Sequence, residues 1–370
     1  MPDSGPGNSS FRLLVLLPNW LGDTVMASGL LSFLDRNRLL PDGRRLHLTL
    51  GVRGSWAPLF ASDPRQDALL TVERPGRHGG ALGAWRLSRL VRAGGFHAAI
   101  LGPPSLRAAA VAFAGKVPLR VGYRADGRGW LLHPAVNALP RGRVHYAQEQ
   151  IELGRVLLAE LGLAAPSRAG VLDDPLPGCA HIASAAKPGD RDRWILAPGA
   201  TYGLAKTWPG PRAVEFARLA LETRQVELVV LGDAAAGPFA ADLALQLGLQ
   251  ARRGLSGLTG LVDLTGKTSL LDVVAILKSA QAFVGNDSGL MHLAGALGVP
   301  TLGLFGSSNP SWTAPLGNRA RAMAAQGFPC QPCYRKTCNQ PVFCLDTLSG
   351  REVLQELEGL LTCPAGTEGS

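Results

Sequence analysis

Charged side chains are scarce in this chain of 370 residues, because Asp, Glu, Lys and Arg make up only 18% of it while hydrophobic residues make up 46%. This composition excludes a disordered or fibrous protein and is typical of a globular one. Long apolar runs are absent as well, since no stretch approaches the roughly 18 to 20 residues that span a bilayer. The length allows two domains of ordinary size.

The first apolar run, residues 11–17, lacks the features of a signal peptide. No basic segment precedes it, Pro18 ends it, and no small-residue cleavage site follows. We therefore expect a buried strand at this position and a protein that works in the cytoplasm.

The net charge of +9 comes entirely from the first half of the chain. Residues 1–165 hold 20 Lys and Arg against 11 Asp and Glu, whereas residues 166–370 hold 17 of each. This asymmetry predicts an acidic partner for the first half, either nucleic acid, a membrane surface or a phosphorylated substrate. A bias in base composition is the alternative, because Arg greatly outnumbers Lys throughout.

Short apolar runs alternate with helical patterns along both halves, which indicates parallel sheets covered by helices. Between the halves the chain is rich in Pro, Gly, Ala and Asp, as linkers are. We expect an α/β protein with domains at 1–165 and 193–345, a linker at 166–192, and a C-terminal helix and tail at 346–370. Strands are predicted at residues 11–17, 46–52, 98–101, 194–197, 226–231, 282–285 and 301–305, and helices at 24–36, 81–93, 211–223, 234–247, 270–280 and 289–297.

Ligands of doubly wound domains bind at the carboxyl ends of the strands, so the loops that follow strands are the candidate sites. The first such loop is Pro18-Asn-Trp-Leu-Gly-Asp. Gly22 lets the backbone turn, and Asp23 falls at the start of a helix, where the dipole favours the ionised carboxylate that a general base needs. A structural helix cap is the alternative, for which Asp is also a preferred residue.

Two loops of the second half have residues suited to a phosphorylated ligand. In residues 198–209, Gly199, Thr201 and Lys206 could bring amides, a hydroxyl and a cation to a diphosphate, although a Gly-rich loop alone is weak evidence. In residues 284–294, Asp287-Ser288-Gly289 opens a helix whose first amides can face an anion, and His292 follows one turn later. A structural turn with a buried histidine would also explain this segment.

Two nucleotide-binding signatures are missing. Gly266-Lys-Thr resembles the end of a P-loop, but the glycine that the motif requires five residues earlier is Leu261. No G-x-G-x-x-G follows the first predicted strand, which argues against a dinucleotide-dependent enzyme.

Four of the six cysteines form a C-x2-C-x4-C-x5-C cluster at Cys330, Cys333, Cys338 and Cys344. Four thiolates can complete the closed tetrahedron of a structural zinc site. Free thiols in a reducing compartment and disulfides are the alternatives.

Together, in this order and across nearly the whole chain, the three loops resemble those of the ADP-heptose:lipopolysaccharide heptosyltransferases, most closely the heptosyltransferase II branch. The segments that carry the resemblance are Pro18-Asn-Trp-Leu-Gly-Asp, Gly199-Ala-Thr-Tyr-Gly-Leu-Ala-Lys-Thr-Trp-Pro and Asn286-Asp-Ser-Gly-Leu-Met-His, followed by Gly306-Ser-Ser-Asn-Pro.

The resemblance implies a GT-B fold, in which two Rossmann-like domains face each other across a cleft, and an inverting transfer that needs no metal ion. It implies that ADP-heptose gives its heptose to the phosphorylated heptosyl-Kdo-lipid A inner core, in lipopolysaccharide biosynthesis of the Gram-negative cell envelope. The enzyme would then touch the inner face of the cytoplasmic membrane peripherally. The alternative is a relative with another heptose or hexose donor, or another acceptor.

The resemblance also implies roles for individual residues. Asp23 matches the base, and Lys206 matches the lysine beside the donor diphosphate or the transition state. The donor site would comprise Gly199, Thr201, Lys206, Asp287, Ser288, Gly289 and His292, and the acceptor site Asn19, Gly22, Arg53 and Arg120, with Arg124, Arg141 and Arg143 as further candidates by position. Asp233 is a candidate for the donor ribose.

A nucleic-acid-binding protein is the competing class, since the first half is basic. Its basic residues are scattered, however, and neither an aromatic stacking platform nor a recognisable zinc-finger spacing accompanies them. We therefore expect no nucleic-acid partner.

Overall fold

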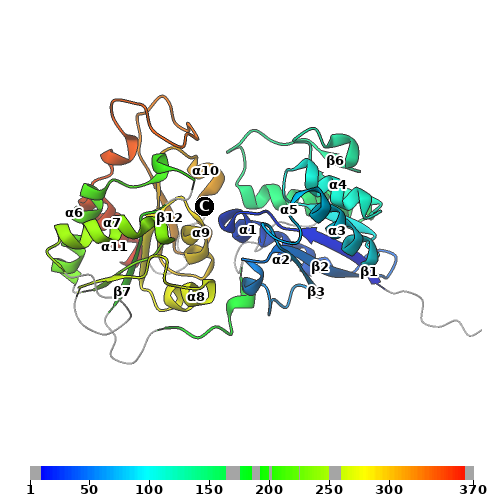
Figure 1. Cartoon of the computed structure of the whole chain (residues 1–370), viewed down its shortest axis with the longest axis horizontal. Coiled ribbons are helices and arrows are strands. Elements are labelled where there is room, and N and C mark those ends of the chain that lie inside the picture. The colour runs from blue at the N-terminus through cyan, green and yellow to red at the C-terminus, as the bar shows by residue number, and fades with distance from the viewer. Residues whose placement is uncertain are drawn as a thin grey trace, which may run out of the picture. The chain divides into compact units, whose positions relative to one another are not determined.

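A computed structural model describes residues 10–163, 176–185, 192–199, 202–224, 226–249 and 260–362. The chain divides into two compact units, Met1–Cys179 and Ala180–Ser370 (Figure 1). The division falls inside the segment 166–192 that the sequence suggests as a linker, of which residues 166–175 and 186–191 lie outside the described residues. Each unit is described by itself below.

Unit 1 has a six-stranded parallel sheet in the order β3-β2-β1-β4-β5-β6. Its strands are β1 (Ser10–Leu16), β2 (Arg45–Arg53), β3 (Ala68–Val72), β4 (Ala98–Leu101), β5 (Leu119–Tyr123) and β6 (Ala135–Val136). Its helices are α1 (Leu21–Ala27), α2 (Gly29–Arg36), α3 (Gly80–Ala93), α4 (Leu106–Ala114) and α5 (Tyr146–Glu160), with the 3₁₀ helices η1 (Ala57–Leu59), η2 (Gly129–Leu131) and η3 (Pro177–Cys179).

Unit 2 has a parallel sheet in the order β12-β11-β10-β7-β8-β9. Its strands are β7 (Arg193–Ala197), β8 (Glu227–Val230), β9 (Gly260–Asp263), β10 (Ala282–Asn286), β11 (Thr301–Phe305) and β12 (Ala320–Ala324). Its helices are α6 (Gly210–Arg224), α7 (Gly237–Gln246), α8 (Leu270–Lys278), α9 (Gly289–Ala296), α10 (Pro310–Thr313) and α11 (Gly350–Thr362), with the 3₁₀ helices η4 (Leu204–Lys206), η5 (Ala234–Ala236) and η6 (Cys344–Thr347).

Both units share one topology. Counted from its own first strand, each sheet runs 3-2-1-4-5-6, the order of a doubly wound Rossmann-like domain. The strand order reverses between β1 and β4 in unit 1 and between β7 and β10 in unit 2. The crevice at that reversal is where such sheets bind ligands, so it directs attention to the loops after these four strands.

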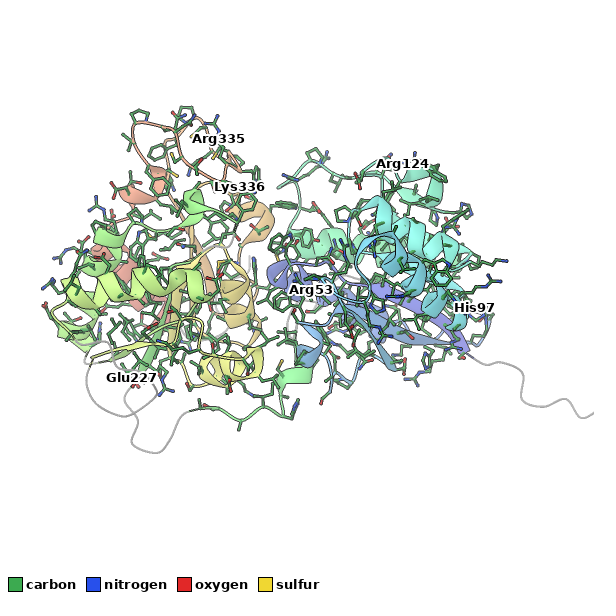
Figure 2. The ribbon with its side chains drawn as sticks, in the orientation of Figure 1. Arg53, His97, Arg124, Glu227, Arg335 and Lys336 are labelled. Carbon is green, nitrogen blue, oxygen red and sulfur yellow. The ribbon has the colours of Figure 1, made fainter. Side chains whose placement is uncertain are left out.

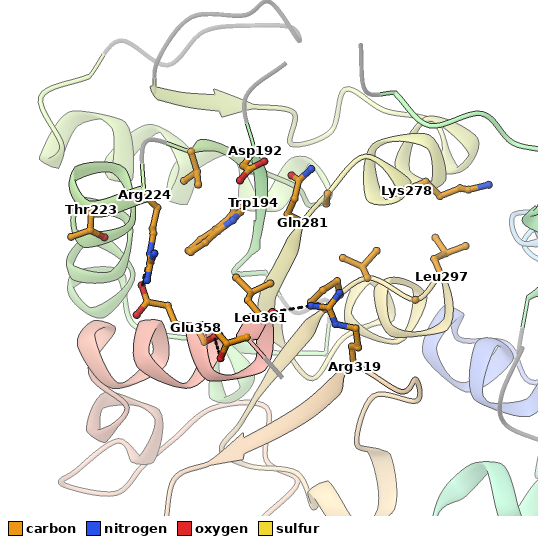
Figure 3. Close-up of a pocket in the computed structure, with 16 residues that line it drawn as sticks. Asp192, Trp194, Thr223, Arg224, Lys278, Gln281, Leu297, Arg319, Glu358 and Leu361 are labelled. Carbon is orange, nitrogen blue, oxygen red and sulfur yellow. Dashed lines mark hydrogen bonds and ion pairs between the residues drawn. The ribbon is translucent and has the colours of Figure 1, made fainter. Parts of the chain in front are cut away.

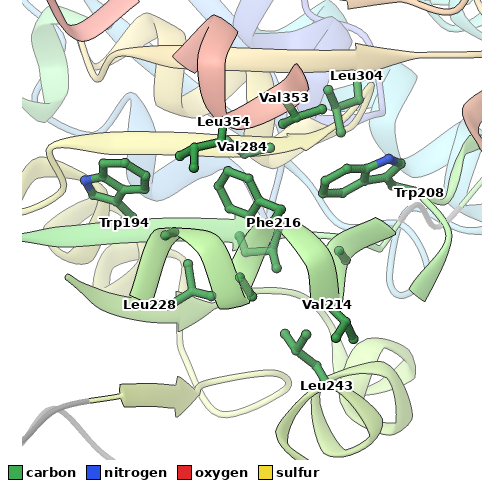
Figure 4. Close-up of a cluster of buried hydrophobic side chains, with 14 of the residues drawn as sticks. Trp194, Trp208, Val214, Phe216, Leu228, Leu243, Val284, Leu304, Val353 and Leu354 are labelled. Carbon is green, nitrogen blue, oxygen red and sulfur yellow. The ribbon is translucent and has the colours of Figure 1, made fainter. Parts of the chain in front are cut away.

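The hydrophobic core of unit 2 anchors the loop that follows β7, because Trp208 at the end of this loop is part of the core. Trp194, Trp208 and Phe216 pack between the sheet and the helices α6 and α11 (Figure 4), with ring centroids 6.5 Å and 6.0 Å from Phe216. The indole of Trp208 is 1% exposed and donates to the carbonyl of Leu348 at 3.0 Å. Replacing a buried ring of this size with alanine would lower the free energy of unfolding by about 3–5 kcal/mol.

The sequence prediction of the elements is confirmed where the patterns were strong, with ends that differ from the prediction by at most three residues. The capping box of Ser269 and Asp272 at the start of α8 is also present. The helix expected at 24–36 is instead two helices, α1 and α2. The buried Ser28 hydroxyl donates to the carbonyl of Val25 at 2.7 Å, and such back-bonding bends a helix.

Among the described residues, no helix combines the length and the apolar character that crossing a bilayer requires.

Candidate active site

The loops after β7 and β10 meet at the strand-order reversal of unit 2, and an ion pair joins them. Lys206 Nζ lies 2.5 Å from Asp287 Oδ2, with the two side chains 17% and 7% exposed. The ammonium also stands 5.3 Å from the centre of the Tyr202 ring. A cation is therefore fixed at the carboxyl edge of the sheet, where doubly wound domains bind their ligands.

Asn286 holds the two loops together just before this pair. Its fully buried side chain accepts a hydrogen bond from the Trp208 amide at 3.1 Å and donates one to the carbonyl of Pro198. Since Trp208 is also anchored in the core, Lys206 lies two residues from a fixed point. Asn286 has no predicted role, and its place directly after the predicted strand at residues 282–285 was the signal that could have indicated one.

Asp287 is held as a carboxylate. Its burial alone would raise its pKa, but the hydrogen bond from His292 and the positive charge of Lys206 outweigh burial and hold the pKa well below its usual value. His292 Nε2 lies 3.5 Å from Asp287 Oδ1. The arrangement orients Lys206 and leaves it little freedom to move.

Several buried polar atoms around this pair have no hydrogen-bond partner within the described residues. They are Ser288 Oγ and His292 Nδ1 at the start of α9, and Ser307 Oγ and Ser308 Oγ after β11. Ser288 occupies the N-cap position of α9 without a side-chain cap bond. Buried polar atoms normally find partners, so a polar ligand at the carboxyl edge would satisfy them. Ser307 and Ser308 were known from the sequence only as part of the Gly306–Pro310 segment.

Four further residues were predicted for the donor site. Gly199 is partly buried at the end of β7, and a Cβ there would stand 3.3 Å from the Ala236 side chain. Gly289 is the first residue of α9. Thr201 lies outside the described residues. Asp233 caps η5, where its carboxylate accepts from the Ala235 amide at 3.1 Å.

In unit 1, Asp23 follows β1 at the corresponding strand-order reversal. It is the third residue of α1, and Trp20 occupies the N-cap position, so Asp23 is not the N-cap residue itself. Its partly buried carboxylate lies near the phenol of Tyr146, the first residue of α5. Burial first, and then the charge of Asp23, raise the pKa of Tyr146 well above its usual value. The phenol therefore stays protonated beside the carboxylate.

A cavity of about 50 Å³ lies at the carboxyl ends of β1 to β4. Its lining includes three arginines, Arg53, Arg74 and Arg107, and also Asn19. None of the described residues that line it is acidic. Burial and the charge of Arg74 lower the pKa of Arg107, so the cations are close enough to repel each other. Arg53 Nε is buried without a partner among the described residues, and its guanidinium stacks 5.6 Å from the Trp56 ring. This chemistry suits an anion.

The other residues predicted for the acceptor site, Gly22 and Arg120, do not line this cavity. Gly22 is buried in α1. Arg120 is outside this cavity: its guanidinium donates to the carbonyls of Leu131, Val117 and Pro118 and stacks on Phe113 at 5.4 Å. Figure 2 labels Arg53 and the exposed Arg124 in unit 1. Arg74 and Arg107 were missed because neither belongs to a recognisable motif.

Cavity size does not identify the site. A cavity of about 820 Å³ opens in unit 2 at the amino ends of β7, β10 and β11, with Trp194, Gln281 and Arg319 on its wall (Figure 3). That edge is opposite to Lys206 and Asp287. Ligands of doubly wound sheets bind at the carboxyl edge. We therefore look for the active site of unit 2 around Lys206 and Asp287 and not in this larger cavity.

Known proteins resemble this chain in sequence. Residues 84–343 match glycosyltransferase family 9 (heptosyltransferase). The chain is 27% identical over 327 residues to lipopolysaccharide heptosyltransferase 2 of Salmonella typhimurium and 26% identical over 317 residues to lipooligosaccharide heptosyltransferase 2 of Haemophilus influenzae, in both cases covering 84% of this chain and 87% of the relative.

Solved structures agree in fold. The E. coli ADP-heptose lipopolysaccharide heptosyltransferase II superposes with a TM-score of 0.69 at 23% identity, covering 95% of this chain and 98% of that one. A family 9 glycosyltransferase from Veillonella parvula gives a TM-score of 0.75 at 20% identity, covering 97% and 99%. The α/β fold of two Rossmann-like domains, the GT-B class, is thereby confirmed. The chain belongs to glycosyltransferase family 9, the heptosyltransferases.

Proposed function

We propose that this enzyme transfers L-glycero-D-manno-heptose from ADP-heptose to the heptosyl-Kdo-lipid A inner core, with inversion and without a metal ion in the chemical step. The names of its relatives support this substrate pair. The observation that carries the proposal is the Lys206–Asp287 pair, which presents a fixed cation at the strand-order reversal of unit 2.

The donor diphosphate leaves with negative charge, which this cation offsets. Lys206 and the amides at the start of α9 supply positive potential, and Ser288, Ser307 and Ser308 supply hydroxyls. Asp287 is a positioning residue, because it acts on the leaving group only through Lys206.

Asp23 is the proposed base. As the acceptor oxygen forms its bond to the anomeric carbon, the bond from that carbon to the diphosphate oxygen breaks and the hydroxyl proton passes to the carboxylate. Its place in the first turn of α1 favours the ionised form that this step requires.

The arginine cavity of unit 1 is the proposed site for an anionic group of the acceptor, either a phosphate or a carboxylate. Arg53 is the principal contact, because its Nε is buried without a partner among the described residues. A charged hydrogen bond there would contribute about 1.5–3 kcal/mol.

A face of unit 1 has the chemistry to contact an anionic bilayer. We call it the α3–α4 face: α3 packs on α4, α4 packs on η2, and the rings of Phe113 and Trp130 stand 6.4 Å apart. Residues 74–125 hold nine Lys and Arg and no Asp or Glu. Exposed tryptophans with surrounding cations are typical of membrane interfaces. The exposed apolar side chains of this face are Leu82, Trp85, Leu90, Leu106, Phe113 and Trp130.

The substrate proposal is tested by turnover. Purified enzyme is given heptosyl-Kdo-lipid A with ADP-heptose, and in parallel with ADP-glucose, UDP-glucose and GDP-mannose. We expect product only with ADP-heptose. Faster turnover with a hexose donor, or with Kdo-lipid A lacking the first heptose, would move the enzyme to another branch of the family.

The membrane proposal is tested by sedimentation with vesicles of phosphatidylethanolamine and phosphatidylglycerol. Trp85→Ser combined with Trp130→Ser should reduce the bound fraction about tenfold, whereas Leu245→Ser, at an equally exposed apolar position of unit 2, should not. Equal binding of both variants would exclude the α3–α4 face.

A further inference from the structure

The four clustered cysteines lie in one loop of unit 2, residues 328–344, here called the cysteine loop. All four line a single cavity of about 20 Å³, together with Ala205 and Ser307. That volume suits one water-sized species and excludes a sugar or nucleotide. The cysteines are free thiols, so the disulfide alternative is absent among the described residues.

The four thiols are neighbours in space, because they line the same small cavity. Cys344 belongs to the hydrophobic core of unit 2, so one corner of the cluster is fixed to the folded body. Cys338 is exposed.

The cysteine loop also supports the loop that carries Lys206. The Tyr202 hydroxyl donates to the carbonyl of Tyr334 at 2.6 Å, and the Ala205 amide donates to the carbonyl of Lys336 at 2.9 Å. A side chain at Gly203 would collide with the Lys336 backbone, so the two loops are in direct contact.

The cysteine loop reaches the segment after β11 as well. The Tyr334 amide donates to the carbonyl of Ser307 at 2.8 Å, and Gln331 Nε2 donates to that of Gly306 at 2.7 Å. The cysteine loop therefore connects two of the loops that form the proposed donor site.

We propose that Cys330, Cys333, Cys338 and Cys344 bind one zinc ion as a tetrathiolate, and that this ion fixes the cysteine loop and, through it, the position of Lys206. Zinc prefers four ligands in a closed tetrahedron with sulfur at about 2.3 Å, and binding releases the thiol protons. Among the described residues no three His, Cys, Asp or Glu side chains are placed so that they could hold a metal ion as they stand. Binding therefore requires the thiols to turn into the shared cavity, and the four bonds would then hold the loop in place.

The first measurement is the metal content of the full-length enzyme after purification without chelators. We expect about one zinc per chain, and less than a tenth of that in Cys333→Ser and in Cys338→Ser. Cys179→Ser is the matched control, because it removes a thiol from unit 1, outside the cluster, and the chain should keep its zinc. A wild-type chain without zinc that also fails to take up added zinc would overturn the site, and stoichiometric iron would overturn the assignment to zinc.

The second measurement is tryptic cleavage after Arg335 and Lys336, two exposed residues of the cysteine loop (Figure 2). Removal of zinc should speed cleavage there at least tenfold in the wild-type and control chains, and Cys338→Ser should be cleaved rapidly from the start. Zinc that binds without protecting these bonds would overturn the proposed link to loop order.

The third measurement is ADP affinity, which should fall about tenfold when zinc is removed, because Lys206 is then held less firmly. Only this measurement rests on the proposed function. Unchanged ADP affinity in a chain that gains tryptic sensitivity would refute the link to Lys206, whereas an enzyme that binds zinc and ADP but transfers no heptose would refute the proposed function alone.

Discussion

Units 1 and 2 share one strand order but differ in what they place at its reversal point. In unit 2 the acid after β10, Asp287, forms an ion pair with Lys206 and lies 3.5 Å from His292 Nε2, so it serves to hold a cation. In unit 1 the acid after β1, Asp23, lies beside the phenol of Tyr146, which stays protonated. A buried ion pair keeps a group in place, whereas an acid beside a neutral donor can still accept a proton. The same scaffold thus supports two chemistries, and the loops determine which.

The difference between the two acids is tested most strongly by replacing Asp23 of unit 1. Asp23→Asn should lower turnover by about 100- to 10,000-fold, because the amide cannot take the acceptor proton. ADP binding, measured by calorimetry, should remain within about twofold because unit 2 is untouched. Asp35→Asn in the adjacent α2 is the control, and its partly exposed ion pair with Arg38 contributes little. Full activity of Asp23→Asn would show that Asp23 is only a structural residue of α1.

Removing the unit 2 cation should have the next largest effect. Lys206→Ala should reduce turnover about 100- to 1,000-fold, because the departing diphosphate loses its counter-charge. ADP affinity should fall as well, unlike in Asp23→Asn. Lys267→Ala is the matched control, since that lysine pairs with Asp263 on the same unit in a more exposed position. Loss of cooperative melting in Lys206→Ala would indicate a structural role instead.

Two arginines were predicted to bind the acceptor, and only Arg53 lines the cavity of unit 1, so replacing each tests whether the acceptor binds in that cavity. Arg53→Ala should raise the KM for the lipid acceptor about 10- to 100-fold with little change in the KM for ADP-heptose, as expected for losing one charged hydrogen bond. Arg120→Ala should leave the acceptor KM nearly unchanged and lower the melting temperature, because its guanidinium serves three backbone carbonyls. The opposite pattern would place the acceptor at Arg120.

The smallest expected effect is on the pH dependence of stability. The pKa of Asp287 in the folded chain lies below the ordinary value of 3.8, so its stabilising contribution is complete above that value and declines as the pH falls below it. Urea unfolding of wild type and Asp287→Asn between about pH 6 and pH 3 should show a constant difference that narrows below about pH 4. A difference that widens in acid would mean that Asp287 is not held as a carboxylate.

Sequence patterns predicted most of the central strands but missed several elements at the sheet edges. The edge strand β3 is only partly buried along its length, so it shows no clear alternation. Helix α4 is short and rich in alanine, a residue found on buried and exposed faces alike. These elements form because neighbours cover them, which local periodicity does not report.

The same limit applies to the site. Asp23, Lys206 and Asp287 were identified because each follows an apolar strand in a recognisable loop. Arg74, Arg107 and Asn286 acquire roles only from partners distant in sequence, and Arg128 is similar: it is fully buried, four backbone carbonyls accept from its guanidinium, and burial lowers its pKa to about 10.

By itself the sequence determined the two α/β domains, the family, and the loops in which the chemistry must lie, because apolar periodicity and short motifs are local properties of the chain. Tertiary structure decided that Lys206 is locked to Asp287 across 81 residues, that Arg53 rather than Arg120 lines a cavity, and that four cysteines share one small space. Those outcomes depend on which strands are neighbours and on what each side chain excludes from water, and both are set only when the sheet assembles.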